Sequence, residues 1–101
     1  MSKNSLNWPG QRENDPAHRR VAEFLVMDIQ HSPEWGRDVL EKIELVKSGK
    51  LPNWERVGNA FCLKLSPTGA TIDDLVDETT PPQTVSLEQL NQAVISWLKQ
   101  M

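Results

Sequence analysis

Apolar residues near the C-terminus recur at intervals of three and four, which is the repeat of one face of an α-helix. The residues that follow this repeat are Leu87, Leu90, Ala93, Val94, Trp97, Leu98 and Met101. Ser86 and Gln89 stand at the spacing of a capping box, and Val85 is placed to pack against Leu90. The pattern predicts a C-terminal helix that packs on a sheet.

A second helical repeat spans residues 33–48. Ser32 is a favourable N-cap for this helix, and a proline at position 33 suits its first turn. Gly49 supplies a left-handed residue at the C-terminal end, and Pro52 stops the helix from resuming. The apolar stripe consists of Trp35, Val39, Ile43 and Val46, with Leu40 at its margin. We expect this stripe to face the core.

Residues 54–73 alternate apolar and polar positions between turn residues, which is typical of an antiparallel meander. The expected strands are residues 54–57, 60–65 and 70–73. The Gly58-Asn59 pair suits a tight hairpin turn, and a second turn falls at residues 67–69. Residues 77–83 contain two consecutive prolines and are expected to form an extended linker.

Residues 21–30 fit either of two elements. An Asp15-Pro16 pair could cap and open a helix, in which Val21, Leu25 and Ile29 align while the other large apolar side chains scatter. The same dense, partly β-branched run suits a strand that is buried on much of both faces. We favour the strand.

These elements predict an α+β domain with the order β-α-β-β-β-α. Three to four antiparallel strands would form a meander, with two helices packed on one face. Residues 15–101 would make up this single domain. Residues 1–14 would form a polar, flexible tail, because they have too few large apolar side chains to offset the entropy of ordering. Trp8 is the exception, since a ring of that size usually docks on its own domain or on another chain.

The composition indicates one small domain of 101 residues, of which 38% are hydrophobic. No apolar run approaches the roughly 20 residues that span a bilayer. Residues 1–5 lack the apolar stretch of a secretion signal. The single cysteine, Cys62, is in keeping with a reducing compartment and with a buried place in the sheet. We expect a cytoplasmic protein without membrane contact.

The chain has four tryptophans and no tyrosine. Trp35 and Trp97 fall on the two helical stripes, so we expect both in the core. Trp54 fits the core and an interface equally well. Trp8 has no partner in the apolar pattern, which makes it a candidate for contact with another chain.

The formal net charge of −3 has the wrong sign for a protein that coats nucleic acid. The N-terminal excess of positive charge comes from Lys3, Arg12, Arg19 and Arg20, and an acidic cluster consists of Asp73, Asp74, Asp77 and Glu78. The acidic residues lack the spacing of a calcium loop and are expected to be solvated. We expect no nucleic-acid partner. A nucleic-acid-associated regulator that acts through the basic N-terminal arm is kept as an alternative.

The residue types needed for catalysis occur without a catalytic pattern. Cys62 lies in the middle of a strand, His18 stands beside two arginines, and His31 directly precedes the Ser32 cap. No Cys-x-x-Cys or His-x-x-x-His spacing, phosphate loop or dinucleotide fingerprint occurs. We expect no catalytic residue, no metal site and no cofactor. The alternative is a small enzyme of unknown reaction that uses His31 with Asp28 or Cys62.

The segment WERVGNAFCL, residues 54–63, follows a predicted helix and precedes a return strand and the acidic cluster. Its Trp54, Arg56 and Gly58 at alternate positions, followed by an aromatic residue, a leucine and a Leu-rich C-terminal helix, resemble the YacL-type family of small uncharacterised bacterial proteins. The layout of helix, meander and helix is similar to that of small toxin-immunity proteins, which act by binding toxin domains. Neither resemblance implies catalytic residues.

We therefore expect a non-enzymatic protein-binding module of the immunity, adaptor or regulator type, whose partner the sequence does not identify. The candidate interaction residues are of types that serve interfaces, namely Trp8, Arg19, Arg20, Trp54, Arg56, Asp73, Asp74, Asp77 and Glu78. A homodimer formed through an edge strand or a swapped N-terminal tail is a second arrangement that such a sheet would allow.

Overall fold

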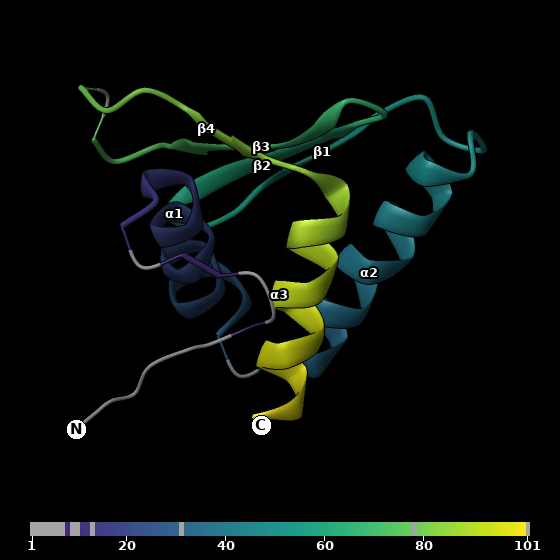
Figure 1. The fold of residues 1–101 in the computed structure, drawn as a ribbon, viewed down its shortest axis with the longest axis horizontal. Coiled ribbons are helices and arrows are strands. Elements are labelled where there is room, and N and C mark those ends of the chain that lie inside the picture. The colour runs from purple at the N-terminus through teal and green to yellow at the C-terminus, as the bar shows by residue number, and fades with distance from the viewer. Residues whose placement is uncertain (1–7, 9–10, 13, 31, 78, 101) are drawn as a thin grey trace.

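The computed structural model describes residues 8, 11–12, 14–30, 32–77 and 79–100. In this part of the chain, helices and strands are segregated along the sequence (Figure 1). In chain order the elements are α1 (Pro16–Phe24), the π-helical turn η1 (Leu25–Ile29), α2 (Pro33–Lys47), β1 (Trp54–Val57), β2 (Phe61–Ser66), β3 (Gly69–Asp74), β4 (Gln83–Val85) and α3 (Leu87–Lys99). The predicted α+β class is confirmed.

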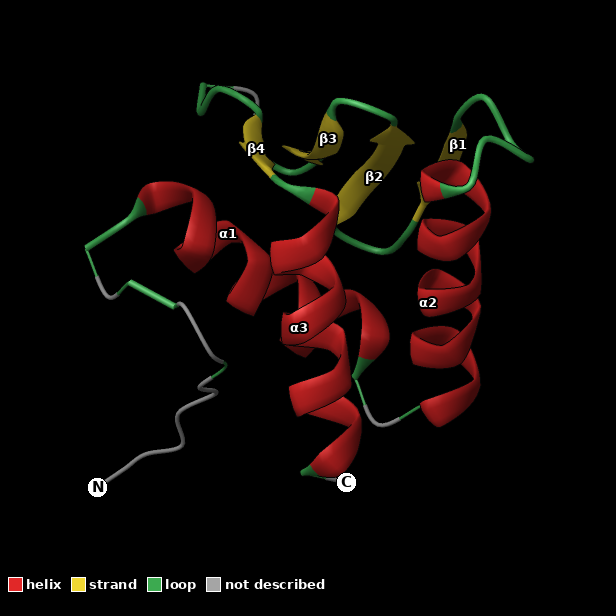
Figure 2. Cartoon of the chain, turned by 45° about the vertical axis from the view of Figure 1, so that its right-hand side comes forward, coloured by secondary structure: helices red, strands yellow, loops and turns green. Residues whose placement is uncertain are grey.

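The four strands form an antiparallel meander in the order β1-β2-β3-β4. The helices α1, α2 and α3 all lie on one face of this sheet (Figures 1 and 2). Side chains alternate along each strand, so Leu63 and Leu65 of β2 face the helices together with their partners Ile72 and Ala70 of β3. Cys62 lies on the opposite face.

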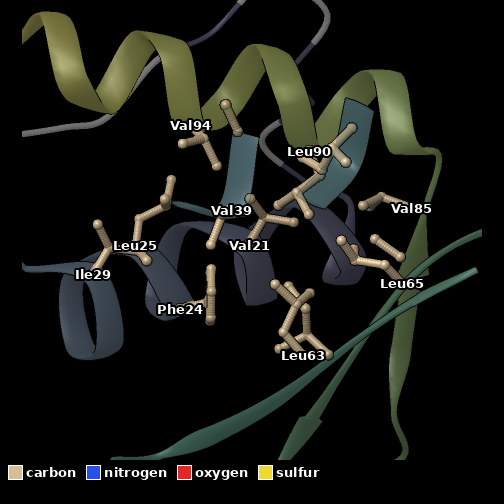
Figure 3. Close-up of a cluster of buried hydrophobic side chains, with 14 of the residues drawn as sticks. Val21, Phe24, Leu25, Ile29, Val39, Leu63, Leu65, Val85, Leu90 and Val94 are labelled. Carbon is tan, nitrogen blue, oxygen red and sulfur yellow. The ribbon is translucent and has the colours of Figure 1, made fainter. Parts of the chain in front are cut away.

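The hydrophobic core fills the space between the sheet and the helices. Side chains from α1, η1, α2, α3 and β2 point toward one another there (Figure 3). The most deeply buried of those labelled are Val21, Phe24, Leu25, Ile29, Val39, Leu63, Leu65, Leu90 and Val94. The core therefore joins the helical N-terminal half to the sheet.

Residues 21–29 are helical and Gln30 forms a turn, so the strand preferred for residues 21–30 is wrong. The helix α1 begins at Pro16, and the Asp15 carboxylate caps it by accepting a bond from the Ala17 N–H at 2.8 Å. This cap and a proline at the first position favour helix nucleation. The strand interpretation gave too little weight to that start signal.

The π-helical turn η1 follows α1 directly. The Gln30 N–H donates to the carbonyl of Leu25, five residues back, at 2.7 Å, which is the bond typical of a π-helical turn. The buried side chains of α1 and η1 keep the spacing of one helix face and include Val21, Phe24, Leu25, Asp28 and Ile29. Val26 and Met27 are apolar but exposed, so the apolar run is denser than the buried face, and this density favoured the strand interpretation.

The order of elements is therefore α-α-β-β-β-β-α, with three α-helices instead of the two expected. The fourth strand is β4, which comes from the end of the predicted linker and not from residues 21–30. It pairs with β3 through Val85 opposite Ala70 and Thr84 opposite Thr71. The two prolines precede β4, where their missing N–H groups remove no ladder bond.

The other two helices follow the sequence pattern. At the start of α2, the Ser32 hydroxyl accepts the Trp35 N–H at 3.3 Å, and beyond its end Gly49 has a φ of 81°. Ser86 and Gln89 form the capping box of α3 with reciprocal bonds of 3.0 and 3.1 Å. These signals are local, which is why the sequence revealed them.

Most of the predicted tail, residues 1–14, lies outside the described residues. Trp8 is described and belongs to the core, with 5% of its surface exposed. Its ring centroid lies 5.7 Å from that of His18, which is itself buried. The Arg12 N–H donates to Nδ1 of His18 at 2.8 Å. Trp8 thus docks on its own domain, one of the two places expected for it.

Candidate functional site

A groove of about 490 Å³ opens between the corner that joins η1 to α2 and the hairpin that joins β1 to β2. The corner contributes Asp28, Ile29, Gln30, Ser32 and Trp35, and the hairpin contributes Arg56, Val57, Gly58 and Asn59. We call this the Arg56 groove. Its two walls are far apart in sequence, so their meeting depends on the tertiary fold.

Among the described residues of the groove lining, Arg56 has the one cationic side chain. Its guanidinium carbon lies 4.1 Å from the ring centroid of Trp35, which is cation–π distance. Its Nη1 atom is buried and has no hydrogen-bond partner within the described residues. A buried charged donor without an acceptor is costly, so Arg56 is prepared to gain free energy from an acceptor that enters the groove.

Trp35 is 48% exposed, which corrects its predicted place in the core. The neighbouring residue Gly36 is buried instead, and a Cβ there would lie 2.7 Å from Cδ2 of Leu98 in α3. The helix α3 therefore approaches α2 at Gly36. Trp35, the preceding residue of α2, lies at the edge of this contact. One part of the indole packs on Arg56 while the rest stays open to solvent.

Asp28 fixes the geometry of the groove. It is 4% exposed, and its Oδ1 and Oδ2 atoms accept the N–H groups of Ala60 and Phe61 at 2.9 and 3.2 Å. A Cβ on Gly58 would collide with the same carboxylate, so glycine permits this close approach. Both oxygens of Asp28 thus bind the hairpin, and the pair of bonds holds the corner and the hairpin together.

Gln30 adopts a backbone conformation that is rare for a residue with a side chain, with φ of 54° and ψ of −131°. Its carbonyl accepts the Trp97 Nε1–H at 2.6 Å, and its side-chain Nε2 donates to the Met27 carbonyl at 2.8 Å. Such strain costs about 1–3 kcal/mol and occurs most often at functional sites, as do π-helical turns. Both features lie in the same wall of the Arg56 groove.

Two predicted candidates near the sheet have partners inside the domain. Arg20 is 6% exposed, and its Nη1 donates to the Ile72 carbonyl at 3.0 Å. Trp54 packs partly buried against the core, with the Lys42 ammonium 5.6 Å from its ring centroid. Arg19 is exposed on α1. Of the eight predicted interaction residues that the structure describes, Arg56 alone lines the groove.

The acidic candidates organise a turn after β3. Asp74 accepts the N–H groups of Val76 and Asp77 at 2.8 and 2.9 Å. Asp77 accepts bonds from the hydroxyl and N–H of Thr79, and these lower the pKa of its carboxyl group. Asp73 lies in β3, and Glu78 lies outside the described residues. No cluster of metal-ligating side chains occurs in the part of the chain that the structure describes.

Two residues of the enzymatic alternative, Cys62 and Asp28, lie in the described part of the chain, and both are engaged in other contacts. The Cys62 thiol lies 3.6 Å from a carboxylate oxygen of Glu55, and burial, with Glu55 adding to it, raises the pKa of the thiol. A raised pKa reduces the thiolate that nucleophilic attack requires. Asp28 has both oxygens engaged by N–H groups. His31 lies outside the described residues.

Comparisons with protein-family models, curated proteins and solved structures found no match. The resemblance to the YacL-type family and the likeness to toxin-immunity proteins therefore stay predictions from the sequence. Among the described helices, none has both the length and the apolar character that a membrane crossing requires. The function is therefore inferred from the Arg56 groove.

Proposed function

We propose that this protein is a non-enzymatic binding module that holds a partner protein in the Arg56 groove. The observation that carries the proposal is the buried Nη1 atom of Arg56, which has no acceptor among the described residues although the rest of the guanidinium is fixed on Trp35. A partner that supplies the acceptor would convert this cost into binding energy.

The surroundings of Arg56 support a protein as the partner. Trp35 is 48% exposed and Val57 is 67% exposed, and tryptophan and arginine are the residue types that most often dominate binding energy at protein interfaces. Leu75 and Val76 are also exposed, and the Leu75 N–H donates to the Ala60 carbonyl at 2.8 Å, which places them beside the same hairpin. Exposed apolar side chains that gather in one region are typical of interaction sites.

The walls of the groove support binding without large rearrangement. The Asp28 carboxylate holds the hairpin, and the Gln30 carbonyl is held by Trp97. A site whose supports are already in place loses less conformational entropy when a partner binds. This arrangement suits a module of the immunity, adaptor or regulator type.

Site-specific photo-cross-linking tests the proposal. A photoreactive amino acid at Val57 should give a discrete protein adduct in an extract of the source cells, identified by mass spectrometry and re-formed with the purified partner. The same group at Thr68, exposed in the turn at the other end of β2, is the control and should give no such adduct. The Arg56→Gln substitution should abolish the Val57 adduct. An adduct that forms equally well in the Arg56→Gln variant, or none at all, would overturn the proposal.

A further inference from the structure

We infer that the partner presents an extended segment that adds a strand to the free edge of β1 and places a carboxylate side chain on Arg56. This inference rests on the proposed function and names the chemistry of the ligand. It depends on two neighbouring features, the open edge of β1 at Val57 and the guanidinium nitrogen of Arg56 that has no acceptor among the described residues.

The first feature is the edge of β1. The strand order leaves β1 paired with β2 alone. The Gly58 N–H donates to the Phe61 carbonyl at 2.8 Å, and hydrogen-bonded pairs alternate along an antiparallel ladder. Arg56 therefore directs its backbone groups toward β2, whereas Glu55 and Val57 direct theirs away from the sheet. These N–H and C=O groups are a template for one more strand.

The second feature is the position of Arg56 relative to that edge. Its partner Leu63 is a core residue, so Arg56 points to the helical side of the sheet, where the groove lies. A residue opposite Arg56 on an added antiparallel strand would point to the same side, with its Cβ about 5 Å from that of Arg56. A side chain at that position would enter the groove beside the guanidinium group of Arg56 and the indole of Trp35.

The chemistry of that side chain follows from the donor. A guanidinium group binds a carboxylate through charge-assisted hydrogen bonds that match its planar geometry. The nearby carboxylate of Asp28 is bound to Ala60 and Phe61 and is not paired with Arg56. The acidic side chain must therefore come from outside the groove lining.

The neighbouring positions extend the recognition motif. Val57 is 67% exposed and Glu55 is exposed, and both point to the outer face of the sheet. Read from N to C along an antiparallel partner, the segment would carry an apolar residue opposite Val57, an acidic residue opposite Arg56 and a basic residue opposite Glu55. Such cross-strand pairs each add to the stability of the strand pairing.

A second copy of this chain does not meet the requirement through the same edge. Opposite residues of an antiparallel pair point to the same side, so Arg56 of one copy would meet Arg56 or Trp54 of the other and never Glu55. Two guanidinium groups in that position would repel each other. The other edge strand of the described sheet, β4, has no acidic side chain and does not supply the carboxylate either. We therefore assign the segment to a different protein.

Titration of the isotope-labelled protein with a designed peptide tests the inference by NMR. The peptide is acetyl-Thr-Val-Val-Glu-Lys-Val-Thr-amide, and the control peptide carries Gln in place of Glu. We expect the Glu peptide to shift the amide signals of Glu55 and Val57 and the indole signal of Trp35. The Gln peptide should bind about tenfold more weakly, because a hydrogen bond to a charged group is replaced by a neutral one.

A proline substitution separates the strand from the carboxylate contact. Val57→Pro removes the N–H that faces the open edge and leaves the bonds between β1 and β2 in place, while Val57→Ala removes the side chain and keeps the N–H. With folding checked by circular dichroism, we expect Val57→Pro to weaken the Glu peptide about tenfold and Val57→Ala to weaken it less.

Several results would overturn the inference and leave the proposed function standing. One is a Val57→Pro variant that binds the peptide normally, which would mean that no strand is added. Another is a peptide with phosphoserine in place of Glu that binds more tightly and ignores Val57→Pro, which would indicate a simple anion site. A third is a peptide that shifts no signal although the cross-link from Val57 still depends on Arg56. Absence of both the peptide shifts and the Arg56-dependent cross-link would reject both proposals.

Discussion

Two arginines lie against the sheet on its helical side, and they differ in what they bind. Arg20 reaches from α1 into a closed contact, where its Nη1 donates to the Ile72 carbonyl and its guanidinium lies 5.8 Å from the ring centroid of Phe61. Arg56 reaches into an open groove, stacks on Trp35, and leaves Nη1 without an acceptor in the described structure. The fold supplies a hydrogen-bond acceptor to Arg20, whereas Arg56 keeps a donor that a partner can use.

The comparison shows that residue type and burial do not identify a binding residue by themselves. Both side chains are mostly removed from water, and both lie near an aromatic ring. They differ in whether the described part of the chain supplies an acceptor. Substitutions should therefore separate the two sites, because loss of a satisfied group lowers stability and loss of an unsatisfied one lowers binding.

The largest effect is expected at the support of the Arg56 groove. Asp28→Ala would leave the buried N–H groups of Ala60 and Phe61 without their acceptor, so we expect a loss of about 3 kcal/mol of unfolding free energy in urea denaturation. Asp28→Asn keeps one acceptor oxygen and should give an intermediate loss. A loss below about 1 kcal/mol for Asp28→Ala would show that the corner and hairpin do not depend on this carboxylate.

A smaller loss is expected at the closed contact of α1. Arg20→Met keeps a long apolar stem and removes the donor to the Ile72 carbonyl, so we expect unfolding free energy to fall by about 2 kcal/mol. The Arg19→Met variant, from the exposed neighbour on the same helix, is the control and should unfold like the parent protein. If the two variants had the same free energy of unfolding, Arg20 would have no stabilising role in the fold.

The equivalent substitution in the groove should cost less. Arg56→Met removes a cation that has no acceptor for Nη1, and it loses the contact with Trp35, so we expect a change below about 1 kcal/mol in the same denaturation measurement. If Arg56→Met destabilised the protein as much as Arg20→Met, the distinction between the two arginines would fail.

The smallest effect is expected at the exposed acidic turn. There the carboxylate of Asp77, like the guanidinium of Arg20, has hydrogen-bond partners within the described structure. Bonds from Thr79 lower the pKa of Asp77 below its ordinary value of 3.8. A carboxyl group whose pKa is lowered in the folded state stabilises the protein at pH values above its ordinary pKa. This stability is lost as the pH falls through the folded-state pKa. Thr79→Val removes the hydroxyl, so its small destabilisation should be greatest near neutral pH and should fade in acid. A destabilisation that does not change with pH would contradict this cause.

The elements that the sequence predicted are those set by local signals. The cap at Ser32, the left-handed Gly49 and the capping box from Ser86 to Gln89 each act within a few residues, and the alternation of residues 60–65 gives the faces of β2. The helix at 21–29 was missed because Val26 and Met27 are apolar but exposed while Asp28 is buried, so the apolar positions differ from the buried ones.

The candidate site was predicted in part. Arg56 was recognised as an interaction residue from its type and position, but its unpaired nitrogen depends on groups brought together by the fold. The exposure of Trp35 depends on the approach of α3 at Gly36, and the role of Asp28 depends on a hairpin more than thirty residues away. Such contacts leave no trace in a local pattern.

The central claim is that Arg56 pairs with a carboxylate of a partner strand. A double-mutant cycle by isothermal titration calorimetry tests it directly, with the parent protein and Arg56→Gln each titrated with the Glu peptide and with its Gln counterpart. We predict a coupling free energy above about 1 kcal/mol between Arg56 and the glutamate. Losses that simply add, with no coupling between the two groups, would contradict the account.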